Sequence, residues 1–179
     1  MTTICVYCAS SERIDPRYIE LATQVGTEIA RRGYGLVSGG GSVSCMGAVA
    51  RAVRAGGGHT TGVIPQALVD MEVADGDADE LVVTRDLRER KGEMDSRSDG
   101  FLALPGGLGT LDEIFEIWVS RSLGMHDKPI VVLDPDGFFA SLREQVASFV
   151  ATGFARPEAV EQVRWTTDVT AAFDLLAPG

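Results

Sequence analysis

The chain has 179 residues, of which 45% are hydrophobic and 23% are charged, and its net charge is −10. This length suits one domain with a substantial core, which we place over residues 1–179. The acidic balance argues against a nucleic-acid partner, because such a partner requires a basic surface. No segment approaches the roughly 18 consecutive apolar residues of a membrane span, so we expect no membrane partner.

The cysteines and the N-terminal sequence indicate a cytoplasmic protein. The three cysteines are an odd number without a disulfide framework, and the first residues lack a secretion signal. Cys5-x-x-Cys8 formally matches a redox motif. However, the apolar run 3–8 predicts a strand, which would send the two thiols to opposite faces, whereas a working motif opens a helix. A redox function is therefore disfavoured.

The chain alternates between strand and helix patterns. Short apolar or β-rich runs predict strands at residues 3–8, 34–37, 59–64, 81–84, 101–104, 129–133 and 163–166. Helical patterns lie between most of these runs, beginning at Asp15-Pro16, passing through 46–53 and 87–97, beginning again at Thr110, and covering 138–150 and 168–176. This alternation predicts an α/β fold in which helices cover both faces of one parallel sheet.

Two segments between these elements have open interpretations. Residues 38–42 read Ser-Gly-Gly-Gly-Ser but lack the Gly-Lys-Ser/Thr of a P-loop and the G-x-G-x-x-G of a dinucleotide site, so a ligand loop and a simple tight turn both remain open. The acidic segment 66–80 predicts either a solvated loop or a mobile flap over a site. His59 and His126 lack neighbouring ligands, so we expect no metal site.

Residues 100–118 carry the clearest functional signal. An apolar strand ends at Pro105, glycines at 106, 107 and 109 allow a sharp turn, and an amphipathic helix follows. We expect Thr110 to cap this helix. A glycine turn that leads into a helix presents unpaired N–H groups and the positive end of the helix dipole. The stretch therefore predicts a phosphate site.

Glu113 has two interpretations at this point. Thr110-x-x-Glu113 matches a capping box, in which the glutamate only accepts a hydrogen bond from the backbone N–H of Thr110. Alternatively, the carboxylate acts on a ligand bound at the glycine turn. The predicted helix 87–97 leads directly into the central strand, so its cations either form a solvated face or lie near the turn. These cations are Arg88, Arg90, Lys91 and Arg97.

The order of the motifs resembles one family. Residues 105–113 read Pro-Gly-Gly-Leu-Gly-Thr-Leu-Asp-Glu, which matches P-G-G-x-G-T-x-x-E, and Glu-Arg-Lys precedes them at 89–91. Together with Gly-Gly-Gly-Ser at 39–42 and Gly-Met-His-Asp-Lys-Pro at 124–129, this series resembles the LOG (Lonely Guy) family of cytokinin riboside 5′-monophosphate phosphoribohydrolases over nearly the whole chain. The resemblance implies a Rossmann-like three-layer sandwich with a central parallel sheet, and a homodimer.

The resemblance also implies an activity and its residues. The expected reaction is hydrolysis of the N-glycosidic bond of AMP or N6-modified AMP, without a metal or organic cofactor. Arg90 and Glu113 correspond to the catalytic pair, and the role of Arg90 is left open between holding the phosphate and assisting the leaving base. The positions that correspond to substrate contacts are Glu72, Lys91, Gly106, Gly107, Leu108, Gly109, Thr110 and Asp112. Departures at Ser44-Cys45 and Val119 concern the shape of the base pocket.

Two other functions fit the same motifs. The glycine loops suit a carrier-like protein that holds a phosphorylated ligand without turnover, although a carboxylate beside the anion favours an enzyme. A nucleosidase for other nucleoside monophosphates is the second alternative. Members of the family are often labelled lysine decarboxylases, but the surroundings of Lys91 and Lys128 show no pattern for a pyridoxal Schiff base.

Overall fold

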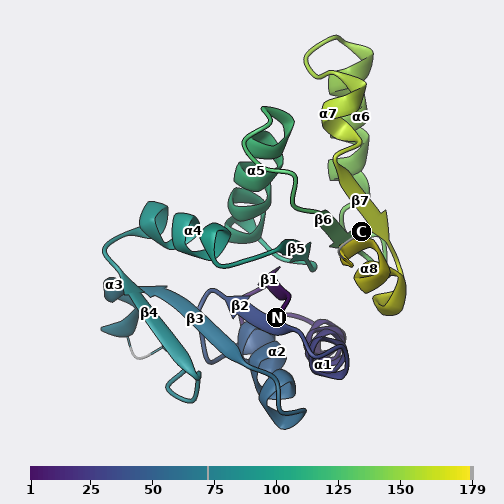
Figure 1. Cartoon of the computed structure of the whole chain (residues 1–179). Helices are drawn as coiled ribbons and strands as arrows, with labels where there is room; N and C mark the ends of the chain where they lie inside the picture. Colours follow the sequence, from purple (N-terminus) through teal and green to yellow (C-terminus); the bar gives the residue numbers. More distant parts are fainter. Residues whose placement is uncertain (72, 178–179) are drawn as a thin grey trace.

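The computed structural model describes residues 1–71 and 73–177, and its centre is one sheet of seven parallel strands (Figure 1). The strands are β1 (Thr3–Tyr7), β2 (Gly35–Ser38), β3 (Thr60–Pro65), β4 (Glu80–Thr84), β5 (Gly100–Ala103), β6 (Ile130–Leu133) and β7 (Val163–Thr166). The helices are α1 (Pro16–Arg31), α2 (Ser44–Ala55), α3 (Gln66–Val69), α4 (Leu87–Ser96), α5 (Leu108–Ser122), α6 (Ala140–Ala151), α7 (Pro157–Val160) and α8 (Val169–Leu176).

The strand order places a change of direction at the middle of the sheet. The order is β4-β3-β2-β1-β5-β6-β7, so the chain builds outwards from β1 to one edge and then returns to pair β5 on the other side of β1. Ile4 therefore lies opposite Leu36 of β2 and opposite Gly100 of β5. In open parallel sheets the crevice beyond the carboxyl ends of two such strands is the usual ligand site.

Helices cover both faces of the sheet, which confirms the expected Rossmann-like three-layer arrangement (Figure 1). Ile4 and Val6 pack with buried residues of α1, α2 and α8, whereas Cys5 and Tyr7 pack with buried residues of α4, α5 and α6. Cys8 belongs to the first cluster and Cys5 to the second, so the two thiols lie on opposite faces as the strand period required.

Side-chain caps set several helix starts that the sequence predicted. The carboxylate of Asp15 accepts a hydrogen bond from the backbone N–H of Arg17 at 3.0 Å, and Pro16 occupies the first position of α1. Asp168 caps α8 in the same way, through the N–H of Ala171 at 2.8 Å. The strand bounds differ from the predicted ones by at most one residue at each end.

Two predictions about local structure were wrong. The segment 66–80 is not an irregular loop throughout, because it begins with the short helix α3. The helix after β5 begins at Leu108 rather than after a Thr110 cap, and α7 was not anticipated. Gly107, in extended conformation, lets the chain enter α5 earlier than a threonine cap would.

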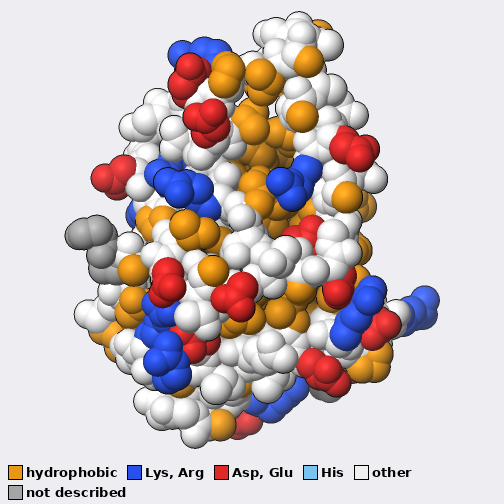
Figure 2. Space-filling model, turned by 90° about the vertical axis from the view of Figure 1, so that its right-hand side faces the viewer, with side chains coloured by type: hydrophobic (Ala, Val, Ile, Leu, Met, Phe, Trp, Pro, Cys, Tyr) orange, Lys and Arg blue, Asp and Glu red, His pale blue; other side chains and the backbone are white. Residues whose placement is uncertain are grey.

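The surface carries mixed charge. On the face that Figure 2 shows, acidic and basic side chains lie interspersed among the described residues, and hydrophobic side chains are exposed in the hollow between them. None of the helices in residues 1–71 and 73–177 is both long enough and apolar enough to cross a bilayer.

Candidate active site

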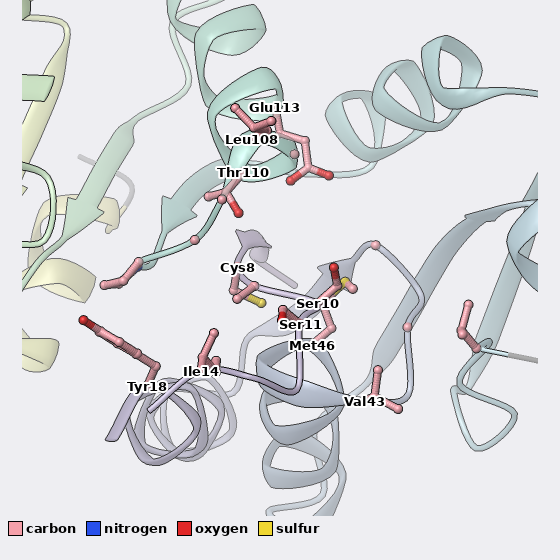
Figure 3. A pocket seen from close by; sticks show the side chains of 18 of the residues that line it. Cys8, Ser10, Ser11, Ile14, Tyr18, Val43, Met46, Leu108, Thr110 and Glu113 are labelled. Carbon is pink, nitrogen blue, oxygen red and sulfur yellow. The ribbon is translucent and has the colours of Figure 1, made fainter. Parts of the chain in front are cut away.

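A cavity of about 560 Å³ lies at the carboxyl ends of β1 and β5, where the strand order changes direction. The segment after β1 contributes Cys8 to Ser11, and the segment after β5 contributes Pro105 to Thr110. In Figure 3, Ser10 and Ser11 lie on the β1 side of this space, and Thr110 and Glu113 project toward it from α5. The topology of the sheet therefore creates the site.

The N-terminus of α5 forms one end of the cavity. Gly107 is the N-cap residue and has no side chain to cap the helix; the N–H of Leu111 donates to the carbonyl of Gly107 at 3.1 Å. The N–H groups of the three residues before Leu111 are those that a helix leaves unpaired at its start, and all three residues line the cavity. With the positive end of the helix dipole, they suit an anion such as phosphate.

The capping-box interpretation of Glu113 was wrong. Thr110 lies inside the first turn of α5 and is buried, so its backbone N–H is not that of a cap residue. Its side chain packs against Gly106, where an added Cβ would overlap Oγ1 and lie 2.8 Å from the Cβ of Thr110. The carboxyl of Glu113 instead faces Arg90: its Oε1 lies 3.6 Å from Nη1 of that arginine.

Burial of Glu113 changes its acidity. Only 8% of the residue is exposed, and loss of hydration raises the pKa of its carboxyl from 4.5 to about 7, although the positive charge of Arg90 acts in the opposite direction. A carboxyl with a pKa near 7 exchanges its proton readily at neutral pH. This property suits general acid–base chemistry.

Arg90 projects from α4 and is held by the backbone of the neighbouring strands. Its Nε donates to the carbonyl of Val63 in β3 at 3.0 Å, and its Nη2 donates to the carbonyl of Gly39 after β2 at 3.1 Å. These bonds leave Nη1 on the side of Glu113. The helix 87–97 thus places one of its cations beside the glycine turn, as one of the two interpretations expected.

The other predicted substrate contacts lie in different places. Lys91 forms ion pairs with Asp112 at 3.1 Å and with Glu116, so it joins α4 to α5. Lys91 and Asp112 are not among the described residues that line the cavity, and their contact with substrate remains a prediction. Glu72 lies outside the described residues.

Sequence reasoning missed the apolar wall of the cavity. The wall comes from the starts of α1 and α2 and the residues just before them, from the end of β3 and the segment after it, and from the segment between β6 and α6; its members are Ile14, Tyr18, Val43, Met46, Ile64, Leu68, Met71, Val73 and Phe138. Figure 3 shows Tyr18 and Ile14 on α1 and the loop before it, and Val43 and Met46 at the start of α2. The residues are scattered along the chain, so no local motif signals them.

Val73 and Asp75 bind the acidic segment to the glycine loop at residues 38–42 and to α2. Asp75 forms an ion pair with Arg54 of α2 at 2.9 Å, and its N–H donates to the carbonyl of Gly40 at 2.8 Å. Ser42 donates its N–H to the carbonyl of Val73 at 2.9 Å. These contacts make the segment a wall of the cavity, against the interpretation of residues 66–80 as a solvated loop.

The positions of the lysines and of possible metal ligands bear on two other kinds of chemistry. Among the described residues that line the cavity, none is a lysine. Lys128 pairs with Asp95 at 2.7 Å, and Lys91 is paired as described above, so neither is placed for a Schiff base in the cavity. No cluster of three or more His, Cys, Asp or Glu side chains suited to a metal occurs in the part of the chain that the structure describes.

The chain is similar to known proteins over most of its length. A family model described as "Possible lysine decarboxylase" matches residues 46–176. A protein of Mycobacterium tuberculosis named cytokinin riboside 5′-monophosphate phosphoribohydrolase is 52% identical, over 98% of this chain and 94% of its own. The Arabidopsis thaliana protein of the same name, LOG3, is 42% identical over 88% of this chain and 74% of its own.

The solved structures show the fold. The molybdenum cofactor binding protein of Rippkaea orientalis superposes with a TM-score of 0.74 at 23% identity, over 97% of this chain and 94% of its own. At this identity, the likeness establishes the fold alone. The match of the family model to most of the chain and the identity to curated relatives show that the chain belongs to the LOG family.

Proposed function

We propose that this protein hydrolyses the N-glycosidic bond of adenosine 5′-monophosphates, with N6-modified AMP as the preferred class of substrate. The products are the free base and ribose 5-phosphate. The names of relatives that are 50% and 52% identical support this activity. The observation that carries the mechanism is the buried pair of Glu113 and Arg90 beside the uncapped N-terminus of α5.

The phosphate docks at the start of α5 in this proposal. The unpaired N–H groups of Leu108, Gly109 and Thr110 bind its oxygens, and the dipole of the 15-residue helix favours its charge. Gly106 and Gly107 allow the backbone to approach closely. The ribose then extends into the cavity toward Glu113, one turn further along α5.

Glu113 acts on the sugar. Cleavage builds positive charge on the ribose, and a carboxylate stabilises this charge while it orients and deprotonates a water molecule. The hydroxyl of the water adds to C1′, the bond from C1′ to the glycosidic nitrogen breaks, and the base leaves with the proton that Glu113 took from the water, which restores the carboxylate. Arg90 stabilises the negative charge of Glu113, and its Nη1 can donate a hydrogen bond to the phosphate or to the leaving base.

The base lies against the apolar wall. Purines and their N6 substituents are largely apolar in surface, and the cavity offers Met46, Leu68 and Met71 among its apolar lining residues. We propose that Lys91, Asp112 and Glu72 contribute at the margin of the site, as the family resemblance implies.

We further propose that the protein is cytoplasmic and acts as a homodimer. Its cysteines are buried free thiols, which suits a reducing compartment. Side chains on the outer side of α5 and just after it are apolar and exposed: Leu108, Val119, Leu123 and Met125. Packing of a second copy against this surface would remove them from water. Light scattering at micromolar concentration tests the dimer, and a monomer mass would refute it.

A substrate panel tests the function. AMP, N6-isopentenyl-AMP, GMP and CMP are incubated with the protein, and the released base is measured by chromatography. We expect release from both adenine nucleotides and faster release from the N6-modified one. Release from GMP or CMP at the same rate would favour the broader nucleosidase, and binding without release would favour a carrier.

Glu113→Gln separates catalysis from structure. Gln keeps the shape of the side chain but neither titrates nor carries charge, so we expect a folded protein that binds AMP and no longer releases adenine. Gly92→Ala on the exposed side of α4 is a matched control, because an added Cβ there meets no other atom within 4 Å. Activity that persists in Glu113→Gln would remove Glu113 from the mechanism.

A further inference from the structure

The glycine loop at residues 38–42 lies directly against the guanidinium of Arg90. A Cβ added to Gly39 would overlap Nη2 of Arg90, and it would lie 3.0 Å from Cζ of that arginine and 3.0 Å from Sδ of Met46. Gly39 is not among the glycines with positive φ, which means that its backbone conformation is open to any residue. Glycine is therefore required here for space, and the space is occupied mainly by the guanidinium of Arg90, with the thioether of Met46 beside it.

The backbone of Gly39 also orients that side chain. Its carbonyl accepts a hydrogen bond from Nη2 at 3.1 Å, while the carbonyl of Val63 accepts one from Nε at 3.0 Å. Two acceptors on one edge of a planar guanidinium fix both its position and its plane. With this edge held, Nη1 is directed toward Glu113 at 3.6 Å.

The loop that carries Gly39 is itself fixed. The hydroxyl of Ser38 accepts a hydrogen bond from the N–H of Gly40 at 3.3 Å, and the carbonyl of Gly40 accepts one from the N–H of Asp75 at 2.8 Å. Gly40 has a φ of +72°, a conformation that glycine adopts readily and that turns the chain at this point. The carbonyl of Gly39 is thus held on both sides along the chain.

We propose that Gly39 is a positioning residue for Arg90: its missing side chain admits the guanidinium, and its carbonyl aims Nη1 at Glu113. The loop 38–42 then serves the reaction through the arginine instead of by contact with a phosphate. The catalytic part of this inference rests on the proposed function, whereas the packing part does not.

A thermodynamic cycle tests the packing part without any activity. Gly39→Ala is made in the natural chain and in Arg90→Ala, and thermal unfolding is followed for all four proteins. Overpacking of the kind expected lowers Tm by about 5 °C in the natural chain. In the Arg90→Ala background the added methyl meets no guanidinium and only the flexible end of Met46, so we expect a much smaller loss. An equal loss in both backgrounds would overturn the proposal, as would no loss in either together with unchanged kinetics.

Kinetics test the catalytic part. We expect Gly39→Ala to lower kcat/KM for AMP by about a hundredfold, because a shift of about 1 Å in a catalytic group has this effect. The acidic limb of the pH profile should also move to higher pH, since Arg90 is the main group that keeps the carboxyl of Glu113 ionised. The other titratable groups near Glu113 are Lys91 and Asp112, with Cys5 and Tyr7 on β1 and Cys8 just after it, and the substitution leaves all of them in place.

A control variant and two further outcomes separate the possible explanations. Gly92→Ala changes a glycine of the same helix as Arg90 at a position with open space, so it should leave the pH limb unmoved and raise Tm by about 2–4 °C, because alanine favours a helix interior over glycine. A Gly39→Ala protein that loses activity with an unmoved limb would show a merely structural role and contradict the proposal. If the natural protein releases no base from AMP or N6-isopentenyl-AMP, the proposed function fails, while the cycle in Tm still decides the role of Gly39.

Discussion

Replacement of Glu113 by Gln should abolish a loss of stability that the natural chain undergoes as the pH rises through about 7. Folding buries this carboxyl and raises its pKa from 4.5 to about 7. The protonated form is therefore favoured in the folded state, and the stabilising effect is complete below about pH 4.5 and lost as the pH rises through 7. Above pH 7 the folded protein must hold a buried carboxylate.

The pKa difference sets the size of the effect. The rise from 4.5 to about 7 corresponds to about 3 kcal/mol, at about 1.4 kcal/mol for each tenfold change in the ionisation constant. The Gln variant lacks this titration, and all other carboxyls titrate equally in both proteins. The free energy of unfolding of the natural chain should thus fall by about 3 kcal/mol relative to the variant between about pH 4 and pH 8.

Urea unfolding at a series of pH values measures this difference. The prediction concerns the change with pH, because the absolute difference also includes the lost attraction between Arg90 and the carboxylate. A difference that stays constant across the series would refute the argument that Glu113 is desolvated. A difference of the opposite sign, with the natural chain gaining stability as the pH rises, would mean that the attraction of Arg90 exceeds the cost of burial.

Three other predictions follow from the site. The kcat/KM for AMP should decline as the pH falls through about 7, because the proposal requires Glu113 as carboxylate; a profile that is flat from about pH 6 to pH 8 would contradict this. Gly106→Ala should destabilise the protein by about 1–3 kcal/mol in urea unfolding, since the added methyl overlaps the side chain of Thr110, and an unchanged midpoint would show that the turn relaxes freely. Asp75→Asn should raise KM for N6-isopentenyl-AMP several-fold with a smaller change in kcat, because the ion pair to Arg54 fastens the apolar wall; exposed Asp77→Asn is its control, and equal effects of the two would refute the role of the pair.

The strand pattern was predictable because buried parallel strands read as short apolar runs. The residues 129–133 and 163–166 were recognised in this way and match β6 and β7 within one residue. The period of two along 3–8 was enough to place Cys5 and Cys8 on opposite faces. The start of α5 was missed because a capping rule based on side chains assigns Thr110, whereas the glycines before it allow the helix to begin without any side-chain cap.

The site was predictable only in part. The glycine turn and Glu113 lie within one motif, so local reasoning located them. Arg90 entered through the family resemblance, because its pairing with Glu113 depends on how α4 and α5 meet on one face of the sheet. The apolar wall depends on long-range packing, including the ion pair of Asp75 with Arg54 that fastens the segment 66–79. Charge composition suggested a solvated loop there, and the tertiary contacts outweighed it.

A crystal structure of Glu113→Gln soaked with AMP tests the central claim most directly, because the variant should bind the nucleotide without cleaving it. We expect the phosphate to accept hydrogen bonds from the backbone N–H groups of Leu108, Gly109 and Thr110, with the side-chain amide at position 113 beside C1′ of the ribose. A phosphate bound away from the N-terminus of α5, or a ribose out of reach of that side chain, would contradict the account.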